Sequence, residues 1–217
     1  SKYLILVFDN HLYCVIHLGM SGTLHFIGLK KKTTNLSFYG SQSLPKKHNH
    51  IIFRFKNFKL IYNDPRRFGF FKILKNKKDY LKFFTRIGPE AISKDFNKKY
   101  LSQILKNRTK NIKNLLLDQK LVSGLGNIYV NEILFQAKIN PFKKSYLINL
   151  DENKRIVKYS KIILKKAIHF GGSSIRDFKG ITGKSGNFQS EFKVYDRAKK
   201  RCSRNNCSGQ INRKIIS

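Results

Sequence analysis

The chain of 217 residues has no tryptophan, one methionine, three cysteines and four prolines, and these scarcities exclude several classes of protein. No apolar run approaches the roughly 20 residues that a membrane-spanning helix needs, and no signal peptide is visible. A small, odd number of cysteines argues against a disulfide scaffold and indicates a reducing compartment. We therefore expect a cytoplasmic protein that makes no membrane contact.

Acidic residues are also scarce, because 12 Asp and Glu face 45 Lys and Arg, which gives a formal net charge of +33. A cationic field of this strength implies a polyanionic partner such as DNA or RNA. Hydrophobic residues make up 41% of the chain, so a packed core is expected rather than a disordered basic tail. The abundance of Lys, Asn, Ile, Phe and Tyr is also typical of an AT-rich genome, which offers a second explanation for part of the charge.

The pattern of apolar residues changes along the chain and divides it into two kinds of structure. Up to residue 74 the short, alternating runs predict strands, with a polar basic loop over Gly28–Lys47 and a tight turn at Asn57–Phe58. From residue 79 the period is helical. The expected strands are Tyr3–Phe8, Leu12–Leu18, Thr23–Ile27, Ile51–Lys56 and Lys59–Tyr62, and the expected helices are Asp95–Leu105, Lys110–Leu117, Asn127–Ala137 and Glu152–Phe170.

The ends of the helices and of the chain carry their own signals. Asn149 and Glu152 predict a capping box at the start of the last helix, and Gly171 is placed to end it. Phe192–Tyr195 reads as a further strand. Ile211–Ser217 reads as a strand interrupted midway and residue 1 is Ser, so we expect the chain to be truncated at both ends.

A glycine-rich turn at residues 124–127 precedes the third helix. Gly124 and Gly126 bracket a turn that a bulky residue makes only at a cost, and Asn127 stands where a helix N-cap belongs. The free N–H groups and partial positive charge of a helix start hold anions such as phosphate. A purely structural turn between two helices is the alternative reading of these residues.

Three further motifs contain arginine or histidine, and two of them also contain glycines. In Asp64–Gly69, two adjacent arginines offer planar donors to a phosphate or a base edge, and Phe68 is suited to wedge between bases; a structural turn with a core Phe is the alternative. In His17–Gly22, Met20 is either an exposed apolar probe or core filling. His48 and His50 stand two positions apart just before an expected strand. This spacing is compatible with a metal site and equally with a phosphate contact by His48.

Cys202 and Cys207 stand near the end of the sequence with four residues between them. Zinc sites use thiolates in such knuckles but need four ligands. The pair therefore predicts a zinc half-site.

These pieces stand in one order along the chain, from Lys2-Tyr-Leu through the motifs above, with Ile87-Gly-Pro-Glu, Gly171-Gly-Ser and Val194-Tyr between them. In that order the sequence resembles the bacterial formamidopyrimidine-DNA glycosylases, which remove oxidised purines in base-excision repair. The resemblance covers essentially the whole chain. It implies an α+β fold with an incomplete N-terminal β-sandwich over residues 1–76, a helical domain with a helix–two-turn–helix motif over 77–190, and part of a zinc finger over 191–217.

The resemblance also implies a role for individual residues in binding double-stranded damaged DNA as a monomer. Lys2 matches the lysine that is assigned proton transfer during strand cleavage. Met20, Arg66 and Phe68 match the residues that fill the gap left by the flipped nucleotide, and Arg66 matches the reader of the opposite base. Phosphate or backbone contacts are implied for His17, His48, Arg108, Lys113 and Asn127; a loop over the flipped base for Gly171, Gly172, Ser173 and Lys184; and one zinc ion, held in part by Cys202 and Cys207.

The sequence departs from the family pattern in its catalytic and zinc residues. The family nucleophile is an N-terminal proline followed by a glutamate, whereas Pro45, Pro65, Pro89 and Pro141 are all internal. A second cysteine pair does not follow Cys207. The sequence therefore predicts the repair function for the family, with glycosylase and AP-lyase activity, but an inactive fragment as printed. A non-catalytic remnant that binds damaged DNA is the alternative.

Overall fold

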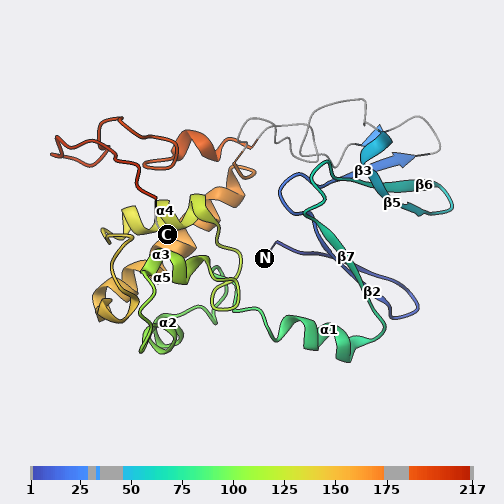
Figure 1. Cartoon of the computed structure of the whole chain (residues 1–217), viewed down its shortest axis with the longest axis horizontal. Coiled ribbons are helices and arrows are strands. Elements are labelled where there is room, and N and C mark those ends of the chain that lie inside the picture. The colour runs from blue at the N-terminus through green and yellow to red at the C-terminus, as the bar shows by residue number, and fades with distance from the viewer. Residues whose placement is uncertain (1, 29–32, 35–45, 174–185, 216–217) are drawn as a thin grey trace. The chain divides into compact units, whose positions relative to one another are not determined.

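The computed structural model describes residues 2–28, 33–34, 46–173 and 186–215, and it shows an α+β protein made of two compact units (Figure 1). One unit comprises Lys2–Phe84 with Phe170–Gln189, and the other comprises Thr85–His169 with Ser190–Ser217. No helix in the described part of the chain is both long enough and apolar enough to cross a membrane.

The first unit contains two antiparallel sheets. The three-stranded sheet has the order β1-β2-β7 and the four-stranded sheet the order β4-β3-β6-β5. The strands are β1 (Leu4–Val7), β2 (Tyr13–His17), β3 (Thr23–Gly28), β4 (Thr33–Thr34), β5 (Asn49–Arg54), β6 (Phe58–Asn63) and β7 (Phe70–Leu74), and helix α1 (Lys77–Phe84) follows them.

Both sheets contribute to one core in this unit. Leu24, Leu60 and Tyr62 of the four-stranded sheet are buried, and Leu6 and Phe71 of the other sheet pack against them. Side chains of a strand alternate between its faces, so each sheet can bury one face in this way. The core thus holds the two sheets together and leaves the turns at their ends exposed.

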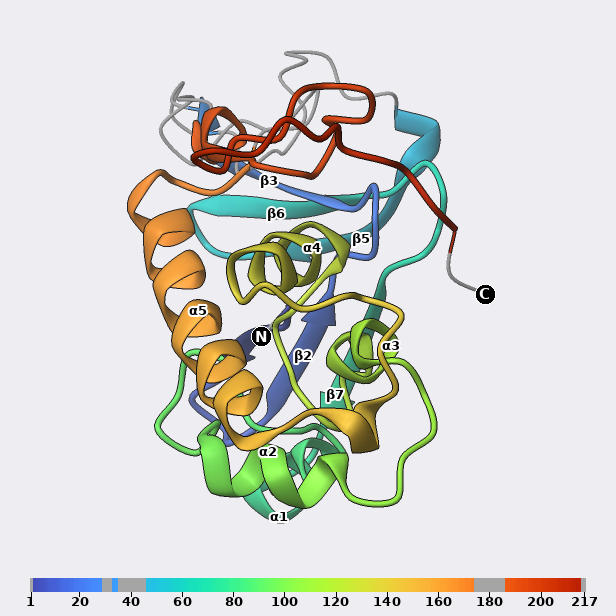
Figure 2. The ribbon, with the colours of Figure 1, turned by 90° about the vertical axis from the view of Figure 1, so that its left-hand side faces the viewer.

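The second unit is built from helices α2 (Lys98–Leu105), α3 (Ile112–Leu117), α4 (Asn127–Gln136) and α5 (Leu150–His169). α5 packs against both α2 and α4, as Figure 2 shows. The apolar faces of these helices are buried, with Leu101, Leu115 and Ile133 among the side chains that have no contact with solvent. Amphipathic periodicity therefore predicted the helical part well.

Asparagine side chains begin three of these helices. Asn97 accepts a hydrogen bond from the N–H of Tyr100, and Asn111 accepts one from Asn114. At α5, Asn149 and Glu152 exchange hydrogen bonds of 2.9 Å in each direction, which confirms the expected capping box. α5 ends at His169 and Gly171 has φ +72°, so the expected glycine end of this helix is also confirmed.

Asn127 is not the N-cap of α4, so that prediction was wrong by one residue. Gly126 occupies the cap position with φ −130° and ψ 177°, and no side chain caps the helix there. Gly124, with φ +87°, is the position in this turn that requires glycine. Asn127 is instead the first residue of the helix and is exposed.

Several strand predictions were wrong or incomplete. Strand β7 and helix α1 were not foreseen as such, Thr33–Thr34 forms strand β4 inside the expected loop, and the turn before β6 spans Phe55–Phe58 with Phe58 already in the strand. Neither Phe192–Tyr195 nor the described residues 211–215 form a strand. Near the second of these segments, the structure has a single bridge between Arg201 and Gln210.

Glu132 explains why Phe192–Tyr195 is not a strand. The side chain of Glu132 belongs to α4 and is only 3% exposed. Its carboxylate accepts hydrogen bonds of 2.8–2.9 Å from the backbone N–H groups of Lys193, Val194 and Tyr195. These N–H groups are satisfied by one side chain instead of a neighbouring strand, so the segment forms a turn fastened to α4.

We expect Glu132→Ala to lower the free energy of unfolding by about 3 kcal/mol, because it leaves three partly buried N–H groups without an acceptor. Thermal or urea denaturation measures this change. Asp151→Asn is the control, because Asp151 is an exposed carboxylate paired with Lys154, and such pairs contribute less than about 1 kcal/mol. Equal stability of the two variants would contradict the role given to Glu132.

Candidate nucleic-acid interface

Asp64 is a fully buried carboxylate that organises the turn after β6. Its side chain accepts hydrogen bonds from the hydroxyls of Ser21 (2.5 Å) and Tyr62 (2.7 Å). It also accepts hydrogen bonds from the backbone N–H groups of Gly69 (3.0 Å) and Arg66 (3.2 Å). One buried charge thus fixes both ends of the segment 64–69 and the neighbouring turn at Ser21.

Hydrogen bonding determines the ionisation of Asp64. Burial favours the neutral acid, but hydrogen bonds from Ser21, Tyr62, Gly69 and Arg66 outweigh that effect and lower the pKa of Asp64 to about 2. Burial and the same carboxylate raise the pKa of the Tyr62 hydroxyl. Near neutral pH, Asp64 is therefore a carboxylate and Tyr62 a neutral donor.

The turn after β2 meets the turn after β6. A Cβ atom added to Gly19 would lie 2.6 Å from the carbonyl carbon of Phe68 and 2.8 Å from the nitrogen of Gly69. Gly19 also has φ +66°, which favours glycine. The two backbones are therefore in direct contact, and Met20 and Phe68 belong to neighbouring turns.

The side chains of these turns face solvent. Met20 is 67% exposed and Phe68 is 54% exposed, so neither fills the core. The Arg66 guanidinium lies 4.7 Å from the centre of the Phe68 ring, a distance suited to cation–π attraction. The structure thus brings together Met20, Arg66 and Phe68, which the sequence had placed 46 to 48 residues apart.

His17 and Lys2 lie in the same unit, at the first two strands. The His17 ring stacks on Phe70, with centroids 5.7 Å apart and an interplanar angle of 10°, and its Nδ1 accepts from the N–H of Gly19 at 3.1 Å. Desolvation, followed by the charge of Lys2, lowers the pKa of His17. Partial burial of its ammonium group lowers the pKa of Lys2. A neutral His17 therefore supports the turn that carries Met20.

His48 and His50 support the Asp64 turn by different atoms. The carbonyl of His48 accepts from the N–H of Asp64 at 3.0 Å, and the His50 ring Nε2 lies 2.9 Å from the carbonyl of Asp64. Within the described residues, no group of three or more His, Cys, Asp or Glu side chains is arranged to hold a metal ion. The metal reading of this histidine pair thus has no support in the structure.

In the helical unit, Gln119 fixes the turn between α3 and α4. Its amide donates to the carbonyls of Leu117 (3.1 Å) and Leu125 (2.8 Å) and accepts from the N–H of Gly124 (3.1 Å). Tyr100 donates from its hydroxyl to the carbonyl of Leu121 at 2.7 Å. These contacts set the position of the α4 N-terminus.

The basic and polar residues predicted for this unit lie around the two helices. Asn127 is exposed at the start of α4, and Arg108 is exposed before α3. Lys113 is in the first turn of α3, and burial lowers its pKa. The first backbone N–H groups of α4 receive no side-chain cap, so the helix start remains suited to an anion.

The segment Gly171–Ser173 begins the loop predicted to cover a flipped base. Gly172 has φ +87°, and its carbonyl accepts from the N–H of Phe188 at 3.0 Å. Ser173 bridges to Asn187 as an antiparallel pair. These contacts close the base of the loop, whereas Lys184 lies outside the described residues.

Cys202 and Cys207 come together in one knuckle. The N–H of Cys202 donates to the carbonyl of Gly209 at 2.8 Å. The Cys207 sulfur accepts a hydrogen bond from the backbone N–H of Gly209 and then one from Cys202, and both lower the pKa of the Cys207 thiol. Two adjacent thiols fit half of a tetrahedral zinc site, and the described part of the chain brings no third ligand to them.

Sequence reasoning missed the residues that hold the exposed turns in place. Ser21, 43 residues before Asp64, and Tyr62, 2 residues before it, both donate hydrogen bonds to the Asp64 carboxylate. Neither was predicted to have this role. Gln119 and Tyr100 were also missed. Gln119 and Tyr100 bind backbone carbonyl and N–H groups, which leave no signal in the sequence. The visible signals are those of the turns themselves, namely their glycines and the Asp-Pro pair.

Comparison with known proteins gives consistent matches to both units. The family model of the formamidopyrimidine-DNA glycosylase N-terminal domain matches residues 1–71, and the model of the H2TH domain of that family matches residues 87–179. A formamidopyrimidine-DNA glycosylase of Roseobacter denitrificans is 40% identical, with 100% of this chain and 76% of that protein covered. One from Wolbachia pipientis is 38% identical, with 93% and 70% covered.

Solved structures agree with the sequence matches. Lactococcus lactis Fpg in complex with DNA containing an abasic site has a TM-score of 0.83 at 33% identity, with 100% of this chain and 75% of that chain covered. The same protein with DNA containing Fapy-dG has a TM-score of 0.82 at the same identity and coverage. From its antiparallel sheets, its helical unit and these matches, the chain belongs to the formamidopyrimidine-DNA glycosylase family.

Proposed function

We propose that this chain functions in base-excision repair. It binds oxidised-purine lesions in duplex DNA, and the activity of the enzyme is that of a glycosylase that is also an AP lyase. Structures of its relatives hold DNA with an abasic site, Fapy-dG or a carbocyclic 8-oxo-G. A base must leave the helical stack before its glycosidic bond can be attacked, and the gap must be filled to offset the lost stacking. The side chains of this chain are suited to both tasks.

The contact between the turns at Gly19 and Phe68 is the observation that carries this proposal. It joins two exposed apolar side chains, Met20 and Phe68, beside the guanidinium of Arg66. Exposed large apolar groups on a rigid turn have a cost in water that insertion into a base stack removes. We assign gap filling to these three residues and reading of the opposite base to Arg66, whose planar donors suit a base edge.

Positive and polar residues in each of the two units are proposed to supply contacts to phosphates. We assign such contacts to Lys2, His17 and His48 in one unit and to Arg108, Lys113 and Asn127 in the other. Phosphate contacts position the duplex without reading its sequence. Lys2 is further proposed to transfer the proton during strand cleavage, since its lowered pKa increases the neutral fraction that can accept a proton.

We further propose a zinc-finger role for the C-terminal segment and a lid role for the loop that begins at Gly171. Cys202 and Cys207 would supply two of the four zinc ligands, and the metal would fix the knuckle. Gly171, Gly172 and Ser173 form the closed base of the loop. Lys184 belongs to the same proposed loop.

We expect Arg66→Ala and Lys113→Ala to affect DNA binding differently. Loss of Arg66 removes a base contact, so discrimination of the base opposite the lesion falls by about 1–3 kcal/mol. Loss of Lys113 weakens binding to all duplexes alike and lowers the salt slope by about one. Binding titrations with four opposite bases at several salt concentrations measure both effects, with exposed Lys165→Ala on α5 as a control. The same profile for Arg66→Ala and Lys113→Ala would refute the assignment.

Asp64→Asn tests the support beneath the exposed turns. The pKa of Asp64 is lowered to about 2 when folded from an ordinary 3.8, so its contribution of about 2 kcal/mol is present above pH 3.8 and is lost as pH falls toward 2. The variant is therefore expected to be less stable at pH 7 and to lack this acid-dependent loss. Urea denaturation between pH 2 and 7 measures it; parallel pH curves for both proteins would argue against an ionised Asp64.

A polypeptide of the 217 printed residues is proposed to bind lesion DNA without forming a Schiff base through proline. The nitrogen of each of its four prolines is in a peptide bond, where resonance removes the nucleophilic lone pair. Borohydride trapping with a DNA duplex that contains 8-oxoguanine is expected to give no covalent complex. A gel-shift assay with the same duplex is expected to show binding. A trapped complex would overturn the prediction that this polypeptide is inactive as a glycosylase.

A further inference from the structure

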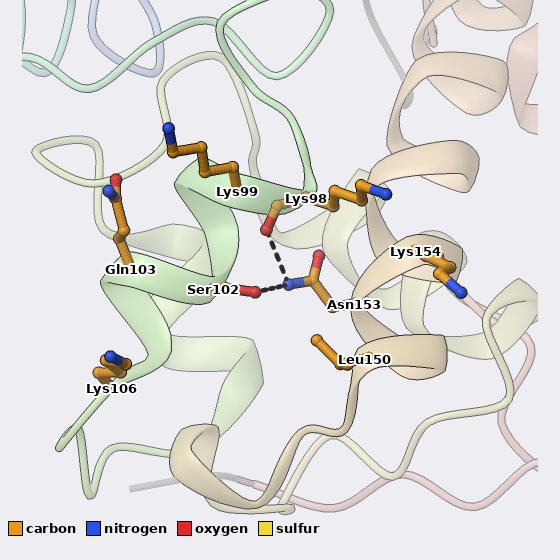
Figure 3. Close-up of a pocket in the computed structure, with 8 residues that line it drawn as sticks. All are labelled: Lys98, Lys99, Ser102, Gln103, Lys106, Leu150, Asn153 and Lys154. Carbon is orange, nitrogen blue, oxygen red and sulfur yellow. Dashed lines mark hydrogen bonds between the residues drawn. The ribbon is translucent and has the colours of Figure 1, made fainter.

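A hollow of about 540 Å³ lies between α2 and the start of α5, within the helical unit (Figure 3). Four of the residues that line it are lysines: Lys98, Lys99, Lys106 and Lys154. No lining residue is acidic. Its volume is in the range of small-molecule sites, and none of the roles assigned above involves its residues.

The hollow contains a buried polar atom without a partner. Asn153 is 2% exposed, and its Nδ2 donates to the carbonyl of Lys98 at 3.0 Å and to the Ser102 hydroxyl at 2.7 Å. Among the described residues, its Oδ1 has no hydrogen-bond partner. The Lys98 carbonyl can only accept, so the amide cannot be turned around. Oδ1 is thus an acceptor that lacks a donor, and Figure 3 shows it between α2 and α5.

Two lysines of the hollow, Lys98 and Lys99, are placed where positive charge is unfavourable without an anion. Lys98 and Lys99 form the first turn of α2, which has no acidic residue to offset the positive end of the helix dipole. Within the part of the chain that the structure describes, the carboxylate that pairs with a lysine of the hollow is Asp151, 3.1 Å from Lys154. An anionic ligand would relieve this concentration of charge.

We propose that the hollow binds a nucleoside monophosphate, which combines an anion with a hydroxyl donor. The lysine ammonium groups neutralise the phosphate, for which lysine is a common partner. Asn153 Oδ1 accepts a hydrogen bond from a ribose hydroxyl. Leu150, which is 73% exposed at the edge of the hollow, offers an apolar surface to the base or sugar. The ligand is either free in solution or the phosphorylated end of a nucleic-acid strand.

Calorimetric titration of the full chain with AMP tests this proposal near physiological salt. We expect a Kd below about 1 mM. The analogue 2′,3′-dideoxy-AMP lacks the hydroxyls and is expected to bind about fivefold more weakly, as for the loss of one hydrogen bond. This change in the ligand tests Oδ1 without disturbing the Asn153 bonds to Lys98 and Ser102, which hold α2 against α5.

Two double variants with the same change in net charge test the lysines. Lys99→Gln with Lys106→Gln removes two charges from the hollow and is expected to weaken AMP binding about tenfold. Lys158→Gln with Lys165→Gln removes two exposed charges from α5 outside the hollow. This control pair is expected to bind AMP within about twofold of the unchanged chain.

Competition distinguishes the two sources of the ligand. The measurement compares a 5′-phosphorylated oligonucleotide with the same oligonucleotide without the phosphate. If only the phosphorylated one displaces AMP, the site binds strand ends. If neither displaces AMP, the site binds free nucleotides. The proposal is overturned by absence of AMP binding at about 10 mM, by equal effects of the two double variants, or by equal affinity for AMP and its dideoxy analogue. Equal displacement by both oligonucleotides would also overturn it, since backbone charge alone would then explain binding.

Discussion

The exposed turns of the β unit depend on the ionised carboxylate of Asp64. Turns that present Arg66 and Phe68 to solvent cannot be held by apolar packing, since the same side chains would then be buried. Four donors converge on Asp64 instead, two from hydroxyls and two from backbone N–H groups. Charge-assisted hydrogen bonds of this kind are about twice as strong as neutral ones. A buried anion therefore lets an apolar and cationic tip keep a fixed position while it is exposed to solvent.

The helical unit solves the same problem with other polar side chains. Gln119 joins three backbone groups of the turn before α4, and Glu132 joins three N–H groups of the C-terminal segment to that helix. In both units, backbone groups that are not part of a helix or sheet are paired with one buried or half-buried side chain. Each such side chain removes the cost of several unpaired groups, and irregular segments next to a site thereby acquire a fixed position.

These long-range polar contacts also mark the limit of what the sequence predicted. The helices and the Asn149–Glu152 cap were predictable because the signals are local: apolar residues at helical spacing and two side chains three positions apart. Phe192–Tyr195 was mistaken for a strand because its partner, Glu132, lies about sixty residues earlier. The motif Asp64–Gly69 was recognised as a turn, but the approach of Gly19 to Phe68 depends on how the two sheets pack, which no local pattern contains.

Net charge alone gives this protein attraction to nucleic acid but no selectivity. A formal charge of +33 attracts any polyanion, and salt weakens that attraction regardless of sequence or damage. Discrimination therefore has to come from groups that gain or lose neighbours according to the shape of the ligand. In the role proposed for them, Met20 and Phe68 would gain contacts only where a base has left the stack, because an intact duplex offers them no gap. By the same reasoning, in the proposed nucleotide site the Asn153 oxygen would distinguish a ligand with a hydroxyl from a bare phosphate, which the surrounding lysines cannot do.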